Sequence, residues 1–323
     1  MERKKYNLTI SEFAQKLSGE KSVALFLHIR PDGDAIGSGF ALKRALLGMG
    51  IDCDVYCDDY VPNKFSFLSV DLTVKNQIDK EYSAFCAVDC ADVSRVGKFA
   101  DAFLNHSRTY NLDHHVSNNR YAVYNTVIES GANAENVFDA LVSSGVKADK
   151  DTSDLLAMGI ITDTGNLGHK NVTERTVSIL AKLVGNGADL HTIIYNTFTA
   201  QSKCRAKLFG KVMNRLRFFY DDKIAIASVF LSDLEETGAT ADETEGFVDF
   251  VMSIRGTEVG VCLMETDNNV FKASLRSNGT DVNEVAGTFG GGGHVLASGC
   301  KIRGEYEEVV DRLVYAIKTR IKE

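Results

Sequence analysis

Short apolar segments alternate with helical patterns through the first 190 or so residues of this 323-residue chain, and this alternation constrains the fold more than any other feature. Strands are predicted at 23–29, 52–56, 84–89, 109–112 and 122–127. Helices are predicted from the capping pair Thr9 and Glu12 to about Leu17, and at 35–50, 133–144, 151–161 and 173–186. Strands that alternate with helices predict an α/β fold with a mostly parallel sheet covered by helices on both faces.

A change in charge marks the boundary between two predicted domains. Between residues 201 and 217 the chain carries six basic residues and no acidic one. Apolar residues recur there at helical spacing, at Leu208, Val212 and Leu216. We therefore predict a connector helix at 201–215 with a solvated basic face, between a first domain at 1–200 and a smaller α/β domain at 216–323.

The overall composition is that of a soluble globular protein, with 44% hydrophobic and 25% charged residues. A net charge of −8 argues against a protein that coats long nucleic acid by charge, but it does not exclude short anionic substrates held through metal ions. No apolar run reaches the roughly 20 residues of a membrane span, and the first residues lack a secretory apolar segment, so we expect a cytoplasmic protein without membrane contact.

The seven cysteines favour reduced thiols over a disulfide framework, because the number is odd and most of them lie in or beside predicted buried strands. Two Cys-x3-Cys pairs, Cys53 with Cys57 and Cys86 with Cys90, raise the alternative of a zinc site. Their spacing differs from the usual Cys-x2-Cys and no loop is available to wrap the ion, so zinc is disfavoured.

The stretch "HIRPDGDAIGS" places ionisable side chains directly after the first long apolar strand, where open α/β sheets form their ligand sites. His28 lies at the end of the strand, and Asp32 and Asp34 lie where the next helix begins. Two carboxylates this close repel each other unless a cation holds them. By itself the stretch also fits a plain Asp-Gly turn that caps the helix.

Three more apolar segments end in the same way, and together they favour a metal centre over separate caps. "FCAVDC" ends on Asp89, "YNLDHH" ends on Asp113, His114 and His115, and "GIITDTG" ends a helical stretch on Asp163. Together with the first stretch, these endings supply about seven metal-competent groups, enough for two ions that share a carboxylate. Imidazole and carboxylate donors suit Mn²⁺, Mg²⁺, Fe²⁺ or Co²⁺.

In that order, the motifs "HIRPDGDAIGS", "AVDC", "DHH" and "GIITDTG" resemble those of the DHH phosphoesterases. The segment "KASLRSNGTDVNEVAGTFGGGGHVLASGC" resembles the DHH-associated substrate-binding domain, so the resemblance spans nearly the whole chain. Chains with these two domains alone are similar to the bifunctional nanoRNase (oligoribonuclease)/pAp phosphatases and to phosphodiesterases of cyclic di-AMP products.

The resemblance implies two divalent ions, with manganese favoured, and assigns their ligands. One ion would be held by His28, Asp32 and Asp89, and the other by Asp34, Asp89, His114 and Asp163, with Asp89 as the bridge. Asp113 would orient a ligand histidine through its ring N–H. His115 would stand near the scissile phosphate or the leaving group as a proton or hydrogen-bond donor.

The second domain is expected to contact the substrate through a glycine run and two side chains. Gly290, Gly291, Gly292 and Gly293 would let the backbone approach a phosphate or nucleotide. His294 and Arg276 would then bind a terminal phosphate. After "TDTG" the family usually has an aromatic residue, whereas residues 166–169 here are Asn-Leu-Gly-His, a departure that bears on nucleotide preference; we expect His169 to be a surface residue.

These features predict a metal-dependent phosphoesterase that releases nucleoside 5′-monophosphates from short single-stranded RNA, including pApA, and that converts pAp to AMP. A pyrophosphatase or exopolyphosphatase, a cyclic dinucleotide phosphodiesterase and a non-hydrolytic nucleotide-binding regulator are the alternatives. The acidic composition disfavours long or duplex nucleic acid as a substrate. Members of the family often pair, which leaves a homodimer open.

Overall fold

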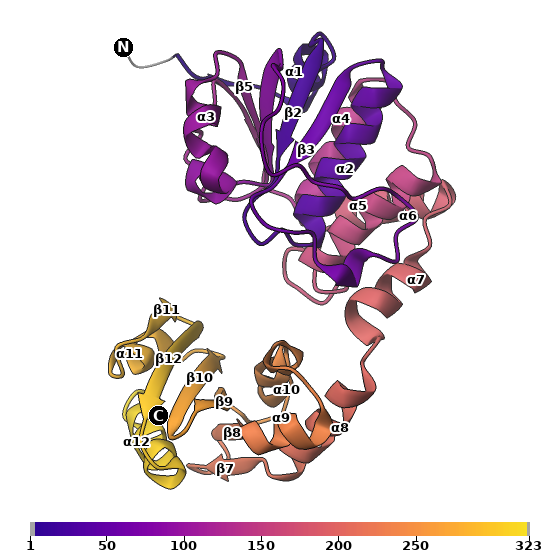
Figure 1. Cartoon of the computed structure of the whole chain (residues 1–323). Helices are drawn as coiled ribbons and strands as arrows, with labels where there is room; N and C mark the ends of the chain where they lie inside the picture. The colour runs from indigo at the N-terminus through magenta and orange to yellow at the C-terminus, as the bar shows by residue number, and fades with distance from the viewer. Residues whose placement is uncertain (1–3, 322–323) are drawn as a thin grey trace. The chain divides into compact units, whose positions relative to one another are not determined.

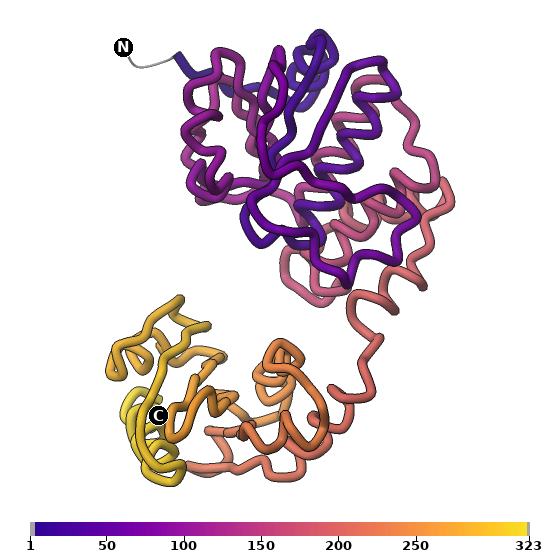
Figure 2. The backbone as a smooth tube through the Cα atoms, viewed as in Figure 1, coloured from indigo at the N-terminus to yellow at the C-terminus, as the bar shows by residue number. Residues whose placement is uncertain are grey.

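The computed structural model describes residues 4–321 and divides the chain into two compact units, Met1–Ala200 and Gln201–Glu323 (Figure 1). Each unit is built around its own six-stranded sheet. The backbone of each unit can be followed in Figure 2, where the colour runs from indigo at the N-terminus to yellow at the C-terminus. Within residues 4–321, no helix combines the length and apolar character needed to span a membrane.

The first unit contains a sheet whose strand pairs are all parallel, with the strand order β1-β6-β5-β4-β2-β3. Its strands are β1 (Tyr6–Asn7), β2 (Ser22–Phe26), β3 (Asp52–Tyr56), β4 (Ala84–Val88), β5 (Thr109–Asp113) and β6 (Tyr124–Val127). All five predicted strands are present, while the two-residue edge strand β1 carries too little pattern to be found from sequence. β2 ends at Phe26, so His28 lies in the loop beyond it rather than at the end of the strand itself.

Helices cover both faces of this sheet, as the sequence predicts. The larger core lies under α1 (Ile10–Leu17), α2 (Gly33–Gly48), α4 (Asn133–Ser143), α5 (Lys150–Asp163), α6 (Glu174–Gly185) and α7 (Leu190–Ile194). On the other face an aromatic cluster packs Phe26, Tyr56 and Phe85 against η2 (Val93–Phe99) and α3 (Ala100–Asn105). The central strands are therefore buried from both sides, which explains their continuous apolar runs.

The order of the strands creates a switch point between β2 and β4. The chain leaves β2 to form β3 on one side and then returns to add β4 on the other side of β2. Open parallel sheets bind ligands in the crevice at such a point, beyond the carboxyl ends of the strands. His28 and Asp89 follow these two strands.

Close contact between α2 and α5 fixes the loops around this crevice, and three glycines make the contact possible. A Cβ at Gly37 would lie 2.3 Å from the Leu155 carbonyl oxygen, and one at Gly33 would lie 2.3 Å from Thr162 Oγ1. A Cβ at Gly159 would lie 2.8 Å from Asp34 Oδ1. Because no side chain separates them, α2 and α5 bring the first turn of one helix beside the last turn of the other.

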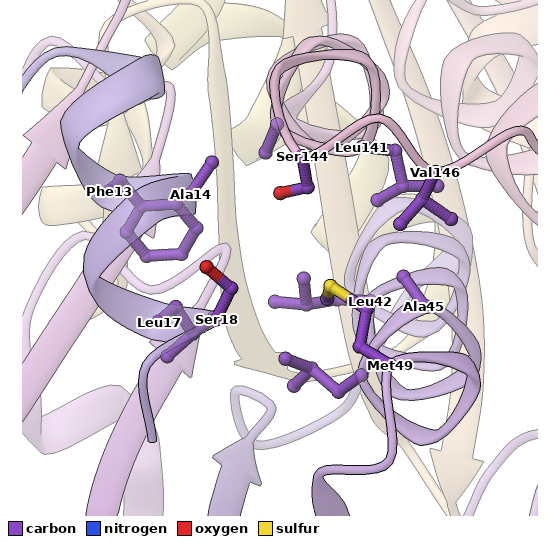
Figure 3. Close-up of a pocket in the computed structure, with 12 residues that line it drawn as sticks. Phe13, Ala14, Leu17, Ser18, Leu42, Ala45, Met49, Leu141, Ser144 and Val146 are labelled. Atoms are coloured by element: carbon purple, nitrogen blue, oxygen red, sulfur yellow. The ribbon is translucent and has the colours of Figure 1, made fainter.

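Away from the crevice, a small pocket lies among α1, α2 and α4 (Figure 3). Apolar side chains such as Phe13, Leu17, Leu42 and Leu141 dominate its lining. Its volume of about 10 Å³ leaves room for about one water molecule, so we regard it as a packing gap rather than a ligand site.

The second unit contains a sheet with the strand order β11-β12-β10-β9-β8-β7, in which the pair β8–β9 is parallel and the other pairs are antiparallel. Its strands are β7 (Arg217–Phe219), β8 (Ile224–Val229), β9 (Val259–Asp267), β10 (Val270–Ser277), β11 (Gly292–His294) and β12 (Ala297–Arg303). Its helices are α8 (Lys203–Asn214), α9 (Leu231–Thr237), α10 (Phe247–Met252), α11 (Val282–Gly287) and α12 (Tyr306–Lys318).

The predicted connector helix corresponds to α8, which lies within the second unit. Leu208 and Val212 are fully buried against β8 and α10, and Leu216 packs beside them. The apolar stripe of this helix is therefore part of the core of the second unit. The basic residues of the segment occupy its other sides, as expected for a surface helix.

Gly37→Ala should destabilise the protein by about 1–3 kcal/mol, since the new Cβ would press on a backbone carbonyl that cannot turn away. Gly48 offers a matched control at the end of the same helix, where nothing lies within 4 Å of a new Cβ. Gly48→Ala should stabilise by about 0.5–1 kcal/mol through the lower entropy of the unfolded chain. Urea unfolding of both variants in chelator measures the difference, and equal effects would show that the close helix contact is not tightly packed.

Candidate metal centre

The carboxyl ends of β2, β4 and β5 bring the predicted site residues together at one edge of the first sheet. β4 lies between β2 and β5, so the residues that follow these strands are neighbours. His28 comes two residues after β2, Asp89 comes directly after β4, and Asp113 is the last residue of β5. Asp89 has a left-handed φ of 58°, and its N–H donates to the Leu112 carbonyl. This conformation is uncommon for a non-glycine residue and turns the chain sharply at the end of the strand.

One group of donors consists of His28, Asp32 and Asp89. His28 Nε2 lies 3.6 Å from Asp32 Oδ2 and 3.7 Å from Asp89 Oδ2. Asp32 caps α2 as well, because its Oδ1 accepts the N–H groups of Asp34 and Ala35. The cap that the sequence offered as an alternative to a ligand is thus present, and the other oxygen of the same carboxylate remains directed at the histidine.

A second group consists of Asp34, His114 and Asp163. His114 Nε2 lies 3.9 Å from Asp34 Oδ2 and 3.7 Å from Asp163 Oδ2, and Asp163 is the last residue of α5. Asp34 is buried and accepts the N–H groups of Asn133 and Ala134, which begin α4. Asp34 is therefore held by the first turn of one helix while it belongs to the first turn of another.

Asp89 connects the two groups. Its Oδ2 faces His28, and its Oδ1 lies 3.4 Å from His114 Nε2 and 3.7 Å from His115 Nδ1. The side chain is 3% exposed, yet Oδ1 accepts no hydrogen bond. A buried carboxylate oxygen without a donor is costly in a protein and calls for a cation.

The two histidines of the Asp-His-His motif are oriented by different partners. His114 Nδ1 donates to the Ser130 carbonyl at 3.1 Å, which leaves the Nε2 lone pair for a ligand. Asp113 Oδ1 accepts from His115 Nδ1 at 2.8 Å. Asp113 thus orients His115 and not His114, so the expectation that it orients a ligand histidine stays a prediction that depends on whether His115 binds an ion.

Burial and mutual repulsion shift the carboxyl pKa values in this cluster. Burial raises the pKa of Asp34 to about 7, although the charge of His114 acts against the rise. Burial also raises the pKa of Asp89 well above the usual carboxyl range, and the nearby charges of Asp34 and Asp32 raise it further. Burial opposes ionisation at Asp32 too, but the hydrogen bond and charge of His28 lower its pKa to about 2. The site thus brings together more carboxylates than its own basic groups neutralise.

These residues fit divalent metal ions. Within each group the donor atoms lie within 4.8 Å of one another, and they are the imidazole and carboxylate donors that such ions prefer. A bound cation would offset the repulsion that raises the carboxyl pKa values, and would supply a partner for Asp89 Oδ1. Asp89, His114 and His115 form a third overlapping group at the same place.

The predicted substrate residues lie in the second unit and also form one group. Arg276 on β10 is opposite Ala297 on β12, and Ala297 is opposite His294 on β11, so the three lie in one row across the sheet. The last two glycines of the run belong to β11. The run also packs closely on β12, because a Cβ at Gly291 would lie 2.3 Å from the Gly299 carbonyl oxygen.

A Cβ at Gly293 would likewise lie 2.6 Å from the Ala297 carbonyl oxygen. Contact with β12 thus excludes a side chain at Gly291 and Gly293, whereas a Cβ at Gly290 or Gly292 would not meet β12. Gly292 nevertheless pairs with Gly299 in the β11–β12 ladder, so contact between the backbone of the run and a phosphate stays a prediction.

Sequence reasoning missed the residues that hold the site residues in place. Ser38 donates to Asp34 Oδ1 one helical turn away, a spacing that could have been noticed. Asn118 donates to Asp113 Oδ2 at 2.6 Å. His28 Nδ1 lies 2.8 Å from the Ile29 carbonyl oxygen and 3.0 Å from Arg95 Nη2, a neighbour that no local pattern indicates.

The segment after Asp163 takes an irregular course. Asn166 and Leu167 have left-handed φ values of 55° and 62°. His169 is exposed, as expected, although its ring lies against Gly165 and its Nδ1 is 3.4 Å from the Asp163 carbonyl oxygen. This histidine therefore supports the end of α5.

Two family models match the chain, one in each unit. The model described as "DHH family, N-terminal domain" matches residues 22–160, and the model described as "DHHA1 domain" matches residues 221–323. The first covers the strands and helices that carry most of the metal-centre residues, with Asp163 just beyond its end. The second covers the sheet that carries Arg276 and the glycine run.

Similar proteins match over nearly their whole length. A protein of Thermus thermophilus named bifunctional oligoribonuclease and PAP phosphatase NrnA is 28% identical, over 94% of this chain and 91% of its own. The protein of that name from Bacillus subtilis is 26% identical, over 97% and 99%. The crystal structure of an exopolyphosphatase-related protein from Bacteroides fragilis has a TM-score of 0.84 at 24% identity, covering 96% of this chain and 95% of its own, which shows the same fold.

Addition of divalent metal to the metal-free protein should raise its stability more at high pH than at low pH. The pKa of Asp34 in the metal-free fold is about 7, above its ordinary value of 3.8, so the native state holds a proton that the unfolded chain releases. This carboxyl therefore makes the metal-free protein less stable as the pH rises from about 4 to about 7. Below about pH 7 a cation must displace that proton, and above it need not.

Melting temperatures with Mn²⁺ and with chelator, at about pH 6 and about pH 8, measure this effect. We expect a larger metal-induced rise at the higher pH, and no rise for Asp89→Asn. Asp101→Asn, at an exposed position on α3, provides the control and should keep the full rise. A rise that is equal at both pH values would contradict the role given to the buried carboxyls.

Proposed function

The chain belongs to the DHH family of phosphoesterases and carries a DHHA1 domain, and from this premise we propose that it is a metal-dependent hydrolase of short oligoribonucleotides and of pAp. On oligoribonucleotides such as pApA it acts as a 3′–5′ exoribonuclease that releases nucleoside 5′-monophosphates, and on pAp it releases phosphate and AMP. The names of the relatives from Thermus thermophilus and Bacillus subtilis support this choice of substrates. Both reactions break a bond between phosphorus and a ribose 3′-oxygen, so one site serves for both.

The observation that carries the proposal is the position of Asp89 between two groups of donors. Its two oxygens face His28 on one side and His114 on the other. A shared carboxylate is what a pair of ions requires, and we propose two ions, with Mn²⁺ as the ion used. When bound, such ions activate water at neutral pH and neutralise the charge of the phosphate that is attacked.

Different residues of the chain would hold the two ions. His28 and Asp32 would hold one ion together with Asp89, and Asp34, His114 and Asp163 would hold the other, also with Asp89. The N–H groups at the start of α4 fix the Asp34 carboxylate, and the Ser130 carbonyl fixes the ring of His114. These two donors are held before any ligand arrives, which lowers the cost of binding.

His115 is suited to act as a proton donor. Its Nδ1 donates to Asp113, and its side chain is 43% exposed, so Nε2 remains accessible. The hydrogen bond with Asp113 raises the pKa of His115 above its ordinary value. We propose that His115 Nε2–H gives its proton to the leaving 3′-oxygen, or donates a hydrogen bond to the phosphate beside it.

We propose 1–200 as the phosphoesterase domain and 216–323 as the substrate-binding domain, joined by the helix at 201–215, which packs into the core of the second unit. Arg276, His294 and the glycine run 290–293 are the proposed substrate contacts. We also place the enzyme in the cytoplasm, which the free state of all seven cysteines supports. The proposed substrates are short single-stranded RNA and pAp, and the names of the relatives support short RNA and pAp.

Hydrolysis of a panel of substrates tests the proposal: pApA, a five-nucleotide RNA, pAp, cyclic di-AMP and pyrophosphate, with Mn²⁺ supplied after chelation. We expect AMP from pApA and pAp, and 5′-monophosphates from the RNA. Asp89→Asn should reduce these rates at least about 10²-fold, since it removes one of the two carboxylates that would hold one ion and one of the three that would hold the other. Asp101→Asn should leave them unchanged. Cleavage of pyrophosphate alone would refute the proposal.

Asp113→Asn tests the role of His115. Without the charge of Asp113 the pKa of His115 falls, so a proton donor at this position loses its proton at a lower pH. The alkaline limb of the kcat profile should therefore move to lower pH, with a loss within the roughly 10²–10⁴-fold that a general acid contributes. If the rate falls equally at every pH, Asp113 only holds the loop in place.

A further inference from the structure

The two faces of the second sheet are covered unequally. One face packs against α11 and α12 across the four central strands, through buried residues of β8, β9, β10 and β12. On the other face α8 and α10 cover β8 and β9, and their buried cluster includes no residue of β10 or β12. Figure 1 shows α12 along one side of this sheet and α10 beside β9 on the other. Part of the second face is therefore open.

A groove of about 720 Å³ lies over this open part. Its floor consists of alternating residues of β9, β10 and β12, and its wall is formed by η4 (Ala241–Thr244) and the start of α10. Pockets of roughly 300–1,000 Å³ are typical for small ligands, so this groove could take one or two nucleotides.

Two lysines face each other on the floor of the groove. Lys272 on β10 is directly opposite Lys301 on β12 in the antiparallel register, and both side chains are exposed. Neither ammonium group has an ion pair or a side-chain hydrogen bond with any residue in 4–321. Like charges directly opposite each other destabilise a sheet, so this pair costs stability and is expected to serve a ligand.

Arg276 and His294 extend the same face. Arg276 lies four residues beyond Lys272 on β10, and side chains an even number apart share a face. The row from Arg276 through Ala297 to His294 runs across three strands, which are spaced about 4.8 Å apart. The unpaired lysines thus share a face of the sheet with the side chains already proposed to bind substrate.

Acidic residues stand on the wall, opposite the lysines, and include Asp242, Glu245 and Asp249. Asp249 Oδ1 lies 3.3 Å from Arg276 Nε, so that guanidinium is already partly neutralised. The free positive charge is therefore concentrated at Lys272 and Lys301. No lining residue is aromatic, which leaves no platform on which a base could stack.

We propose that this groove binds the phosphodiester backbone of the substrate strand at nucleotides other than the one released, with Lys272 and Lys301 as the residues that favour oligonucleotides over mononucleotides. This inference rests on the proposed function and adds a determinant of substrate length to it. Two lysines neutralise about two phosphates, which suits short RNA. Because the lining offers no aromatic ring for a base, the lysines contribute through the phosphates, which every nucleotide of the strand carries.

The test compares Lys272→Gln, Lys301→Gln and the double variant with Lys318→Gln. Lys318 lies on α12, which covers the opposite face, and its substitution removes the same charge from the same unit. Binding of a labelled five-nucleotide RNA by the full-length protein in chelator is measured by fluorescence anisotropy over a range of salt. With Mn²⁺ restored, kcat/KM is measured for the same RNA and for pAp.

We expect weaker RNA binding for each groove variant, and a fall of about 0.7 per lysine in the slope of log K against log salt. The kcat/KM for RNA should fall and that for pAp should stay, while thermal stability should not decrease because a repulsion is removed. Equal losses for RNA and pAp, or an equal effect of Lys318→Gln, would overturn the inference. Activity of the wild-type protein on pAp distinguishes this failure from a failure of the proposed function.

Discussion

Desolvated negative charge at the carboxyl ends of three parallel strands is the constraint on which the first unit depends. Asp34 and Asp89 are buried beside Asp32, Asp113 and Asp163, and burial raises the pKa of the first two. Such a cluster is unfavourable by itself, since one buried carboxylate oxygen lacks any donor. The fold tolerates it because helix N-termini, histidines and a bound cation can each carry part of the compensation.

The start of α2 shows how closely fold and site are joined. Asp32 caps the helix and faces His28, whereas Asp34, two residues later, is held by the first turn of α4 and faces His114. Two carboxylates near each other in sequence thus belong to different donor groups. The glycine contacts allow α2 and α5 to pack closely together. This packing places Asp163, at the end of α5, 3.7 Å from His114 Nε2, which also faces Asp34.

In the second unit the two faces of the sheet differ in the same way between core packing and exposed charge. One face builds the core with α11 and α12, and the other is closed by α8 and α10 over β8 and β9. The open remainder carries Lys272 and Lys301 in register, a pair that a purely structural sheet would avoid. The second half of the glycine run begins the edge strand β11, and Gly291 and Gly293 lie too close to β12 to carry a side chain.

Local sequence pattern determined the α/β class, the five main strands of the first unit and the residues at the strand ends. Strands buried on both faces require continuous apolar runs, and a ligand site places charged residues where those runs end. Tertiary structure decided what no spacing could: that Asp113 meets His115, that Arg95 reaches His28, and that Lys272 stands opposite Lys301. These contacts join residues through strand register and helix packing, which depend on the whole sheet and not on the local sequence.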